Sequence, residues 1–283
     1  MPRAKNGAVE LEYETFGDPR NDAILLINGL GSQMTRWPEA FCGLLVEKGL
    51  FVIRFDNRDV GLSTWLESGQ HYTTDDMAND AAAVLDAVGK PQAHIAGVSM
   101  GGMIAQVFAA NHPQRTLSLT SIMSSSGNPG LPTGTPAAMA ALMARPMDPG
   151  DADFISESVK RAETIGSPGF PWPEGALAAR ARAEAERAFN PRGVAHQMAA
   201  VQAGGDRRPK LATISVPTVV LHGADDPLVP VAAGRDTAAN IKGAELIVVP
   251  GMGHDLPPAL YPTFVDAIWT AVTRARAAQP ATA

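Results

Sequence analysis

The sequence HIAGVSMGGMIAQ (residues 94–106) places one serine, Ser99, among three glycines, between an apolar run typical of a strand and an Ala-rich run typical of a helix. Glycine is used where the backbone needs a conformation or a close approach that a side chain forbids. Residues 97–101 match G-x-S-x-G, a turn that projects a nucleophilic serine from the end of a strand. Because a helix follows the turn, the amide of Met100 faces the place where an oxyanion would form. The stretch therefore predicts a strand, a sharp turn carrying a nucleophile, and a helix.

Strand-like and helix-like runs alternate along most of the chain. Short apolar or β-branched runs lie at 9–14, 23–28, 50–56, 93–99, 117–123, 218–223 and 245–251, and helix-like runs lie at 36–47, 73–88, 100–112, 230–240 and 259–276. From the second run onward the strands are apolar enough to be buried on both faces. This alternation predicts an α/β fold, with a mostly parallel central sheet and helices on both faces.

The segment 127–210 departs from this alternation. It contains helix-like pieces rich in Ala, Met and Arg, separated by joints rich in Pro and Gly, and no convincing strand. An insertion between two strands of an open α/β sheet is expected over the carboxyl ends of the strands, where such sheets bind ligands. We therefore predict a core domain of residues 1–126 and 211–283 with a helical cap, or lid, of residues 127–210.

Three side chains of the predicted lid are candidates for a substrate pocket. Met139 and Met143, together with Met147, recur every four residues and would share one face of a helix. Such a stripe forms either core packing or a malleable apolar pocket wall. Trp172 lies between two prolines and is either an anchor of the lid or a pocket surface. Met139, Met143 and Trp172 are therefore predicted pocket residues.

A serine hydroxyl becomes a good nucleophile only when a base removes its proton and a further group orients that base. The loop after the run at 218–223 offers Asp225 and Asp226 as the orienting group. His254 follows the next run, in a loop whose two glycines allow the ring to bend toward Ser99. His222 lies at the end of a strand and is explained equally well as a core histidine. We therefore predict His254 as the base.

The order Ser, Asp, His, with each residue after a different strand, is the order found in α/β-hydrolases. Further stretches carry the same resemblance, which covers nearly the whole chain outside the lid. They are ILLINGLG (24–31), RFDNRDVGLST (54–64), GVSMGG (97–102) and PGMGHDLP (250–257). The chain resembles the α/β-hydrolase superfamily and, within it, small esterases of the aclacinomycin methylesterase type.

The resemblance implies further assignments. In relatives, the loop after the strand at 24–27 carries His-Gly-x and supplies an oxyanion amide, which falls here on Leu30, although Asn28 replaces the histidine. The family's G-x-x-D-P spacing, counted from Gly223, favours Asp226 over Asp225 as the orienting carboxylate. The oxyanion hole is therefore predicted at the amides of Leu30 and Met100.

The stretch RFDNRDVGLST resembles the family's Asp-x-Arg-x-x-Gly-x-Ser loop, at Asp56, Arg58, Gly61 and Ser63. We expect this loop to be a structural corner that supports the sheet. A calcium loop is not expected, because the acidic residues do not fall on alternate positions and no distal Glu closes a loop. The resemblance implies a serine hydrolase that needs neither a metal nor another cofactor.

The composition of the chain excludes several classes of partner and of structural feature. The 283 residues carry a formal net charge of -6 and no stripe of Lys or Arg, so nucleic acid is not expected as a partner. Cys42 is the single cysteine, which excludes an intramolecular disulfide. No apolar run reaches the length of a membrane span and the N-terminus lacks the apolar region of a secretory signal. We predict a cytoplasmic protein without a membrane partner, either a monomer or a homodimer.

These predictions combine into a function. We expect a serine esterase that cleaves carboxylic esters of small to medium apolar substrates through an acyl-enzyme on Ser99, with His254 as base and Asp226 orienting it. The same three residues would also serve lactone opening, carbon–carbon bond hydrolysis or cofactor-free perhydrolysis. A ligand receptor built on a hydrolase fold is a further alternative, which negligible turnover together with ligand-dependent partner capture would reveal.

Overall fold

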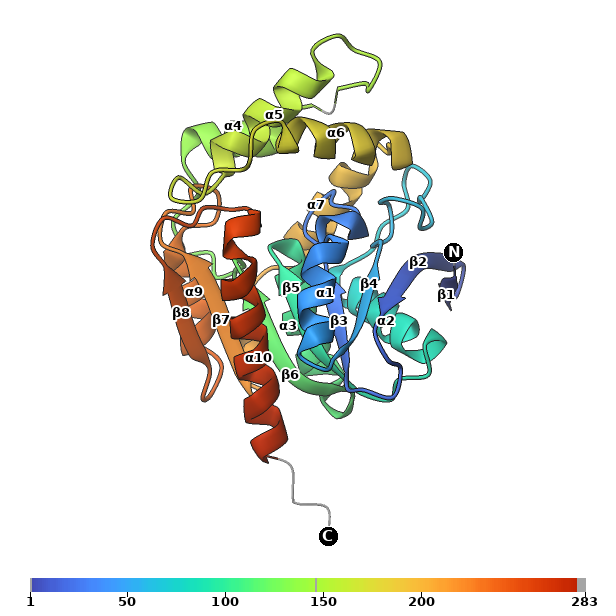
Figure 1. The fold of residues 1–283 in the computed structure, drawn as a ribbon, viewed down its shortest axis with the longest axis vertical. Coiled ribbons are helices and arrows are strands. Elements are labelled where there is room, and N and C mark those ends of the chain that lie inside the picture. The colour runs from blue at the N-terminus through green and yellow to red at the C-terminus, as the bar shows by residue number, and fades with distance from the viewer. Residues whose placement is uncertain (1, 146, 279–283) are drawn as a thin grey trace.

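The computed structural model describes residues 2–145 and 147–278, and an eight-stranded sheet forms its centre (Figure 1). The strands are β1 (Arg3–Asn6), β2 (Val9–Phe16), β3 (Ala23–Ile27), β4 (Phe51–Phe55), β5 (Ala93–Val98), β6 (Thr116–Ile122), β7 (Thr218–Gly223) and β8 (Glu245–Val249). Their order in the sheet is β1-β2-β4-β3-β5-β6-β7-β8. β1 and β2 pair antiparallel, as do β2 and β4, whereas β4, β3 and β5 to β8 are parallel. The predicted fold class is confirmed.

Helices cover both faces of this sheet. They are α1 (Glu39–Glu47), α2 (Thr74–Ala87), α3 (Met100–Asn111), α9 (Val231–Ala239) and α10 (Tyr261–Ala278), with short 3-10 helices at Met34–Arg36, Pro113–Arg115 and Pro258–Leu260. Leu25 and Ile27 of β3 belong to the core layer that α2 and α3 complete, whereas Ile24 and Leu26 belong to the layer that α1 and α10 complete. Because neighbouring residues of a strand point to opposite faces, an entirely apolar β3 can supply both layers.

The strand β1 was not expected, because RAKN has no apolar run. Its conformation depends on pairing with β2, in which Ala4 lies opposite Leu11. Ala4 and Leu11 are both buried in the layer that α2 completes. A strand this short is formed by its partner and by the packing of one side chain, not by its own propensity.

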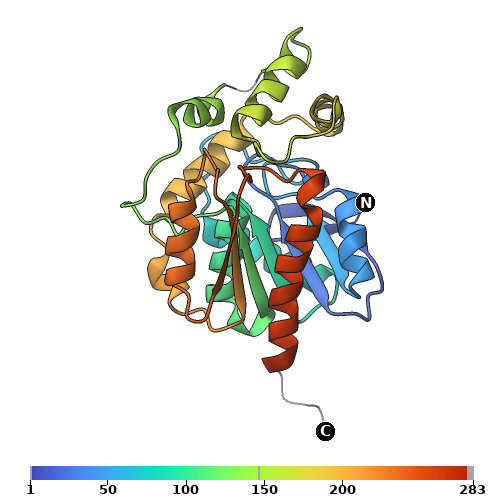
Figure 2. The same cartoon turned by 60° about the vertical axis from the view of Figure 1, so that its left-hand side comes forward.

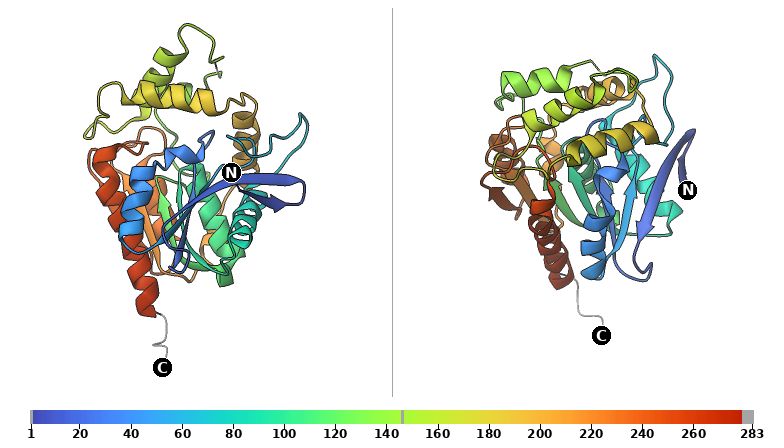
Figure 3. Two further views of the ribbon diagram at one scale, coloured as in Figure 1. Left: turned by 45° about the vertical axis from the view of Figure 1, so that its right-hand side comes forward. Right: turned by 45° about the horizontal axis from the view of Figure 1, so that its top comes forward.

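A helical insertion separates β6 from β7. It contains α4 (Pro136–Met143), α5 (Phe154–Ile165), α6 (Ala176–Arg187), α7 (Gly193–Gly204) and α8 (Arg208–Leu211), and the described part of 127–210 holds no strand. Figures 2 and 3 show α4, α5 and α6 stacked over one end of the sheet. That end is the carboxyl edge of the parallel strands, where β5 runs into the turn at Ser99. The insertion therefore covers the edge at which open α/β sheets bind ligands.

Polar contacts join α6 to the loop that follows β3. Gln33 Nε2 donates to the carbonyl oxygens of Glu184 and Ala188 at 2.7 and 3.0 Å. Arg36 forms a two-point ion pair with Glu184, with 2.8 Å between Nη2 and Oε2. Arg187 Nη1 donates to Gln33 Oε1 at 2.7 Å. The end of α6 and the 29–36 loop therefore hold each other in place.

Among the residues the structure describes, none of the helices combines enough length with enough apolar character to traverse a lipid bilayer.

Candidate active site

Ser99 lies at the tip of the turn between β5 and α3, with φ 54° and ψ −121°. A non-glycine residue in this sparsely populated region costs about 1–3 kcal/mol and persists only where the surroundings enforce it. Here the Ser99 amide donates to Ile122 O at 2.9 Å, and Ser124 Oγ donates to Ser99 O at 2.8 Å. A Cβ at Gly97 would lie 2.1 Å from Gly101 O, so only glycine permits β5 and α3 to approach this closely. The G-x-S-x-G pattern is thus a steric requirement of the turn.

His254 comes from the loop after β8 and reaches the Ser99 hydroxyl. Its Nε2 lies 2.9 Å from Ser99 Oγ, although the two residues are 155 positions apart. The backbone amide of His254 donates to Ile165 O at the end of α5, at 2.7 Å. The insertion therefore helps to hold the loop that carries the imidazole.

Asp226 orients the His254 ring from its other side. Its Oδ2 lies 2.7 Å from His254 Nδ1, and its Oδ1 accepts from the amides of Leu228 and Val229 at 2.9 and 2.8 Å. An ionised carboxylate only accepts hydrogen bonds, so Nδ1 is the donor and Nε2 is left to accept from Ser99. The structure thus brings the three predicted residues into one hydrogen-bonded chain.

The competing residues have other partners. Asp225 Oδ2 accepts from the Gly251 amide at 2.7 Å, which ties the loop after β7 to the loop that carries His254. His222 is fully buried. Its Nε2 donates to Val229 O at 2.7 Å and lies 3.6 Å from Asp226 Oδ2, beyond hydrogen-bond distance. Burial lowers the pKa of His222, which keeps the ring neutral in the core. His222 therefore has the role of a core histidine.

The predicted oxyanion amides flank Ser99. Met100 is the first residue of α3, where amides have no acceptor within the helix. On the other side, a Cβ at Gly29 would lie 3.2 Å from Ser99 Cβ, so the chain entering Leu30 passes directly against the serine. Leu30 and Met100 thus lie on the two segments that border the hydroxyl.

A residue of the insertion fixes the loop that contains Leu30. Gln197 of α7 accepts from the Gly31 amide through Oε1 at 2.8 Å and donates to Arg58 O through Nε2 at 2.9 Å. Gln197 is fully buried, so these hydrogen bonds are shielded from water. Gln197 was not predicted from the sequence, because nothing in the residues around a helical glutamine indicates that it will hydrogen-bond to two distant loops.

The stretch 54–64 forms the structural corner that was expected. The fully buried Asp56 accepts from the amides of Met34 and Leu62 at 2.7 and 3.0 Å and pairs with Arg187 at 2.7 Å. Burial raises the pKa of Asp56, while Met34 and Arg187 act to lower it. Ser63 Oγ donates to Asp56 O at 2.6 Å. These contacts connect the corner with the 29–36 loop and with α6.

A cavity of about 610 Å³ opens between the sheet edge and the insertion, and Ser99 and His254 both line it. This volume is within the range of pockets that hold small organic ligands. Trp172 and Met147 also line the cavity, whereas Met139 and Met143 do not. Because α4 ends at Met143, the four-residue repeat does not continue to Met147 on one helical face, and Met143 is 65% exposed. The structure thus corrects the prediction that Met139 and Met143 form the pocket wall.

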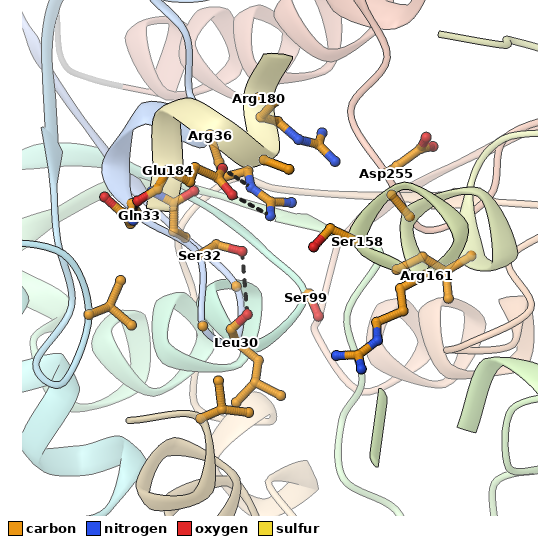
Figure 4. Close-up of a pocket in the computed structure, with 18 of the residues that line it drawn as sticks. Leu30, Ser32, Gln33, Arg36, Ser99, Ser158, Arg161, Arg180, Glu184 and Asp255 are labelled. Atoms are coloured by element: carbon orange, nitrogen blue, oxygen red, sulfur yellow. Dashed lines mark hydrogen bonds and ion pairs between the residues drawn. The ribbon is translucent and has the colours of Figure 1, made fainter. Parts of the chain in front are cut away.

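Charged side chains share the cavity with apolar ones (Figure 4). Arg36 is paired with Glu184, and Arg161 Nη2 donates to Arg145 O at 3.0 Å. The guanidinium of Arg180 lies over the Trp172 ring, 4.6 Å from its centroid. The cavity is therefore less apolar than the sequence suggested. The alternation of Arg and Glu in residues 180–187 is typical of a solvated helix face, so it gives no sign of a position in the cavity wall.

Within residues 2–145 and 147–278, no three His, Cys, Asp or Glu side chains are grouped so that they could hold a metal ion.

Comparison with known proteins agrees with this architecture. The family model described as alpha/beta hydrolase fold matches residues 22–257. The chain therefore belongs to the α/β-hydrolase family.

Individual relatives are consistent with an esterase-like member of that family. The chain is 31% identical over 281 residues to a rhodomycin D methylesterase of Streptomyces sp. (strain C5), an alignment that covers 92% of this chain and 94% of the relative. It is 28% identical over 241 residues to a 3-oxoadipate enol-lactonase of Acinetobacter baylyi, with 85% of each chain covered. Among solved structures, a hydrolase from Pseudomonas aeruginosa is 28% identical with a TM-score of 0.73, covering 95% of this chain and 96% of that one.

Proposed function

We propose that this protein is a serine hydrolase that cleaves carboxylic esters through an acyl-enzyme on Ser99. One observation carries the proposal: Ser99 Oγ, His254 and Asp226 form a continuous hydrogen-bonded chain, with steps of 2.9 and 2.7 Å, at the wall of the cavity. A base within hydrogen-bond reach of a serine, itself oriented by a carboxylate, is the geometry that activates a hydroxyl for nucleophilic attack.

In the first half of the reaction, His254 Nε2 takes the Ser99 proton as Oγ attacks the ester carbonyl carbon. The tetrahedral oxyanion is held by the amides of Leu30 and Met100. Asp226 keeps Nδ1 protonated and stabilises the imidazolium as it forms. The imidazolium then gives its proton to the leaving alkoxide, so an alcohol departs and the acyl group remains on Ser99.

In the second half, His254 Nε2 takes a proton from water, and the hydroxide attacks the acyl carbon. Collapse of this second tetrahedral intermediate returns the proton to Ser99 Oγ and releases the carboxylic acid. Each half uses the same amide donors. In such sites the loss of one donor costs about 3–4 kcal/mol.

We propose an ester of small to medium size as the substrate. The cavity volume of about 610 Å³ supports this range, and the methylesterase relative at 31% identity supports the ester bond. A lactone is the second candidate, because the enol-lactonase relative aligns over 85% of this chain. A lactone is an internal ester, so the same steps open it without a separate alcohol product.

The proposal is tested with Ser99→Ala and His254→Ala. Either change is expected to reduce hydrolysis of p-nitrophenyl butyrate to near background, while the melting temperature shows that the variant is folded. The matched controls are Ser156→Ala and His71→Ala, which replace exposed residues outside the cavity lining. A fluorophosphonate is expected to label Ser99, as peptide mass mapping would show.

Retained turnover in both site variants would refute the assignment, as would a fluorophosphonate adduct on another serine. Parallel assays with p-nitrophenyl butyrate and a γ-lactone rank the two candidate substrate classes. A folded wild-type protein that turns over neither class would contradict hydrolysis and favour the receptor alternative.

A further inference from the structure

Arg180 differs from the other arginines that line the cavity. It lies on α6, and in the described part of the chain its guanidinium makes neither a hydrogen bond nor an ion pair. Its guanidinium stacks on the face of Trp172, and the carboxylates of Glu184 and Asp255 act on its charge only through space. By contrast, Arg36 is paired with Glu184, and Arg161 donates to a backbone carbonyl. The five N–H donors of Arg180 are therefore unused.

None of the described carboxylates that line the cavity lies within ion-pair distance of Arg180, and each has a partner elsewhere. Asp255 accepts from Ser167 Oγ at 2.5 Å and from Trp172 Nε1 at 2.7 Å. Asp59 accepts a hydrogen bond from the Leu66 amide and contacts the His196 ring. Glu157 forms an ion pair with Lys160, and Glu184 forms one with Arg36. Asp255 thus faces neutral donors, although the Arg180 charge acts on it through space.

Burial, together with the nearby Arg36, lowers the pKa of Arg180 to about 10, although the more distant charges of Glu184 and Asp255 act to raise it. Arg180 is therefore a cation at neutral pH, partly removed from water and without an anionic partner of its own. A buried charge in this state is unfavourable until an anion reaches it. Stacking on Trp172 leaves the edge of the planar guanidinium available, and this edge matches a carboxylate with two parallel hydrogen bonds.

We infer that Arg180 is the core of an anion subsite that takes a carboxylate carried by the ester substrate itself. This inference rests on the proposed function, because the subsite belongs to the cavity that contains Ser99. Figure 4 shows Arg36, Arg161 and Arg180 disposed around the space in which Ser99 lies. The substrate class is therefore an ester or lactone with a free carboxylate remote from the bond that is cleaved, such as a monoester of a dicarboxylic acid.

The apolar residues of the cavity fit the same substrate class. Leu142, Phe154, Leu177 and Val194 line the cavity together with the arginines. An aliphatic or aromatic spacer between ester and carboxylate would contact these side chains. The carboxylate at the end of the spacer would form hydrogen bonds with Arg180. One substrate molecule would therefore contact both the apolar side chains and the charged side chain of the cavity.

A pair of substrates that differ in one group tests the subsite. We compare p-nitrophenyl hydrogen adipate with its terminal amide, p-nitrophenyl adipamate, in the wild type, Arg180→Met and Arg182→Met. Methionine keeps an unbranched stem against Trp172 but removes the charge. Arg182 is exposed on the same helix, outside the cavity lining, and is the matched control.

The expected result is a change in the kcat/KM ratio of acid to amide. Hydrogen bonds between charged groups are worth about 1.5–3 kcal/mol, so Arg180→Met is expected to lower this ratio about tenfold to a hundredfold. Arg182→Met is expected to leave it unchanged. An unchanged ratio in Arg180→Met would overturn the inference. An equal loss with both substrates would also overturn it, since that result assigns Arg180 a purely structural role.

Two further outcomes are separable. If the wild type hydrolyses neither of these esters, nor p-nitrophenyl butyrate, nor the γ-lactone, the proposed function fails. Binding still tests the subsite in that case: in Ser99→Ala, adipate is expected to raise the melting temperature and adipamide is not. Equal shifts with the two ligands would refute the subsite, even if Arg180→Met does not fold.

Discussion

Asp225 and Asp226 are adjacent in the chain, yet their carboxylates take unrelated partners. Asp226 Oδ2 lies 2.7 Å from His254 Nδ1, whereas Asp225 Oδ2 accepts from the Gly251 amide at 2.7 Å. One carboxylate therefore orients the imidazole, and the other holds the loop on which the imidazole is carried. Both affect His254, but only Asp226 forms a hydrogen bond with its ring.

Replacing each aspartate by asparagine separates these two effects. Asp226→Asn is expected to lower kcat with p-nitrophenyl butyrate by about 10⁴-fold, the loss that the corresponding change causes in a serine protease by favouring the wrong tautomer. Asp225→Asn is expected to remain near wild type, because the asparagine carbonyl still accepts from Gly251. Comparable losses in the two variants would contradict the assignment of Asp226.

The ion pair between Arg187 and Asp56 is expected to be a main support of the insertion. Asp56 is fully buried, and removing one partner of a buried pair typically costs about 3–5 kcal/mol. We expect Arg187→Met to lower the free energy of unfolding in urea by about 3 kcal/mol. Activity should fall as well, since Arg187 also contacts Gln33 in the loop that carries Leu30.

The control for this prediction is Arg182→Met on the same helix. A double variant, Asp56→Asn with Arg187→Met, should recover part of the lost stability, because it leaves no uncompensated charge. A loss below about 1 kcal/mol in Arg187→Met would show that the amides of Met34 and Leu62 suffice to hold Asp56.

His94 is expected to make stability depend on pH. It is buried in β5 with Nδ1 2.8 Å from Ser118 Oγ, and burial lowers its pKa to about 4. The His94 side chain has a pKa of about 6.5 in the unfolded chain. Below that pH, His94 binds a proton in the unfolded chain but stays neutral in the folded protein. The contribution of neutral His94 is thus complete above pH 6.5 and is lost as the pH falls toward 4.

The loss approaches about 1.4 kcal/mol per pH unit within this window. Urea unfolding of the wild type between pH 6.5 and 5 should therefore show a fall of about 1.5 kcal/mol from this residue. His94→Gln should lack that part of the slope, whereas His71→Gln, which replaces an exposed imidazole, should retain it. Equal slopes in the wild type and His94→Gln would refute the prediction.

Much of the fold was predictable because its signals are local. Apolar runs of strand length and their alternation with helical runs indicated the parallel sheet from β3 to β8. The glycines around Ser99 signalled the turn, because the clash that excludes a side chain at Gly97 arises between residues four positions apart. The loops carrying Asp226 and His254 were located in the same way, since each follows an apolar strand.

The lining of the cavity was not predictable in this way. Met139 and Met143 share a sequence pattern with Met147, but α4 ends at Met143, and only Met147 lines the cavity. Arg180 belongs to an alternation of Arg and Glu that is typical of a solvated helix. Its burial becomes apparent only once α6 lies over the sheet edge, and the same holds for the two hydrogen bonds of Gln197.

The sequence by itself determined the order of strands and helices, the turn at Ser99 and the loops of Asp226 and His254, because periodicity and steric exclusion act between near neighbours. Only the tertiary structure decided which side chains meet. The contact between Ser99 and His254 and the position of Arg180 depend on how segments far apart in the chain pack together. Contacts between distant segments produce no repeat or residue spacing within either segment, so they cannot be predicted from the sequence pattern of one segment alone.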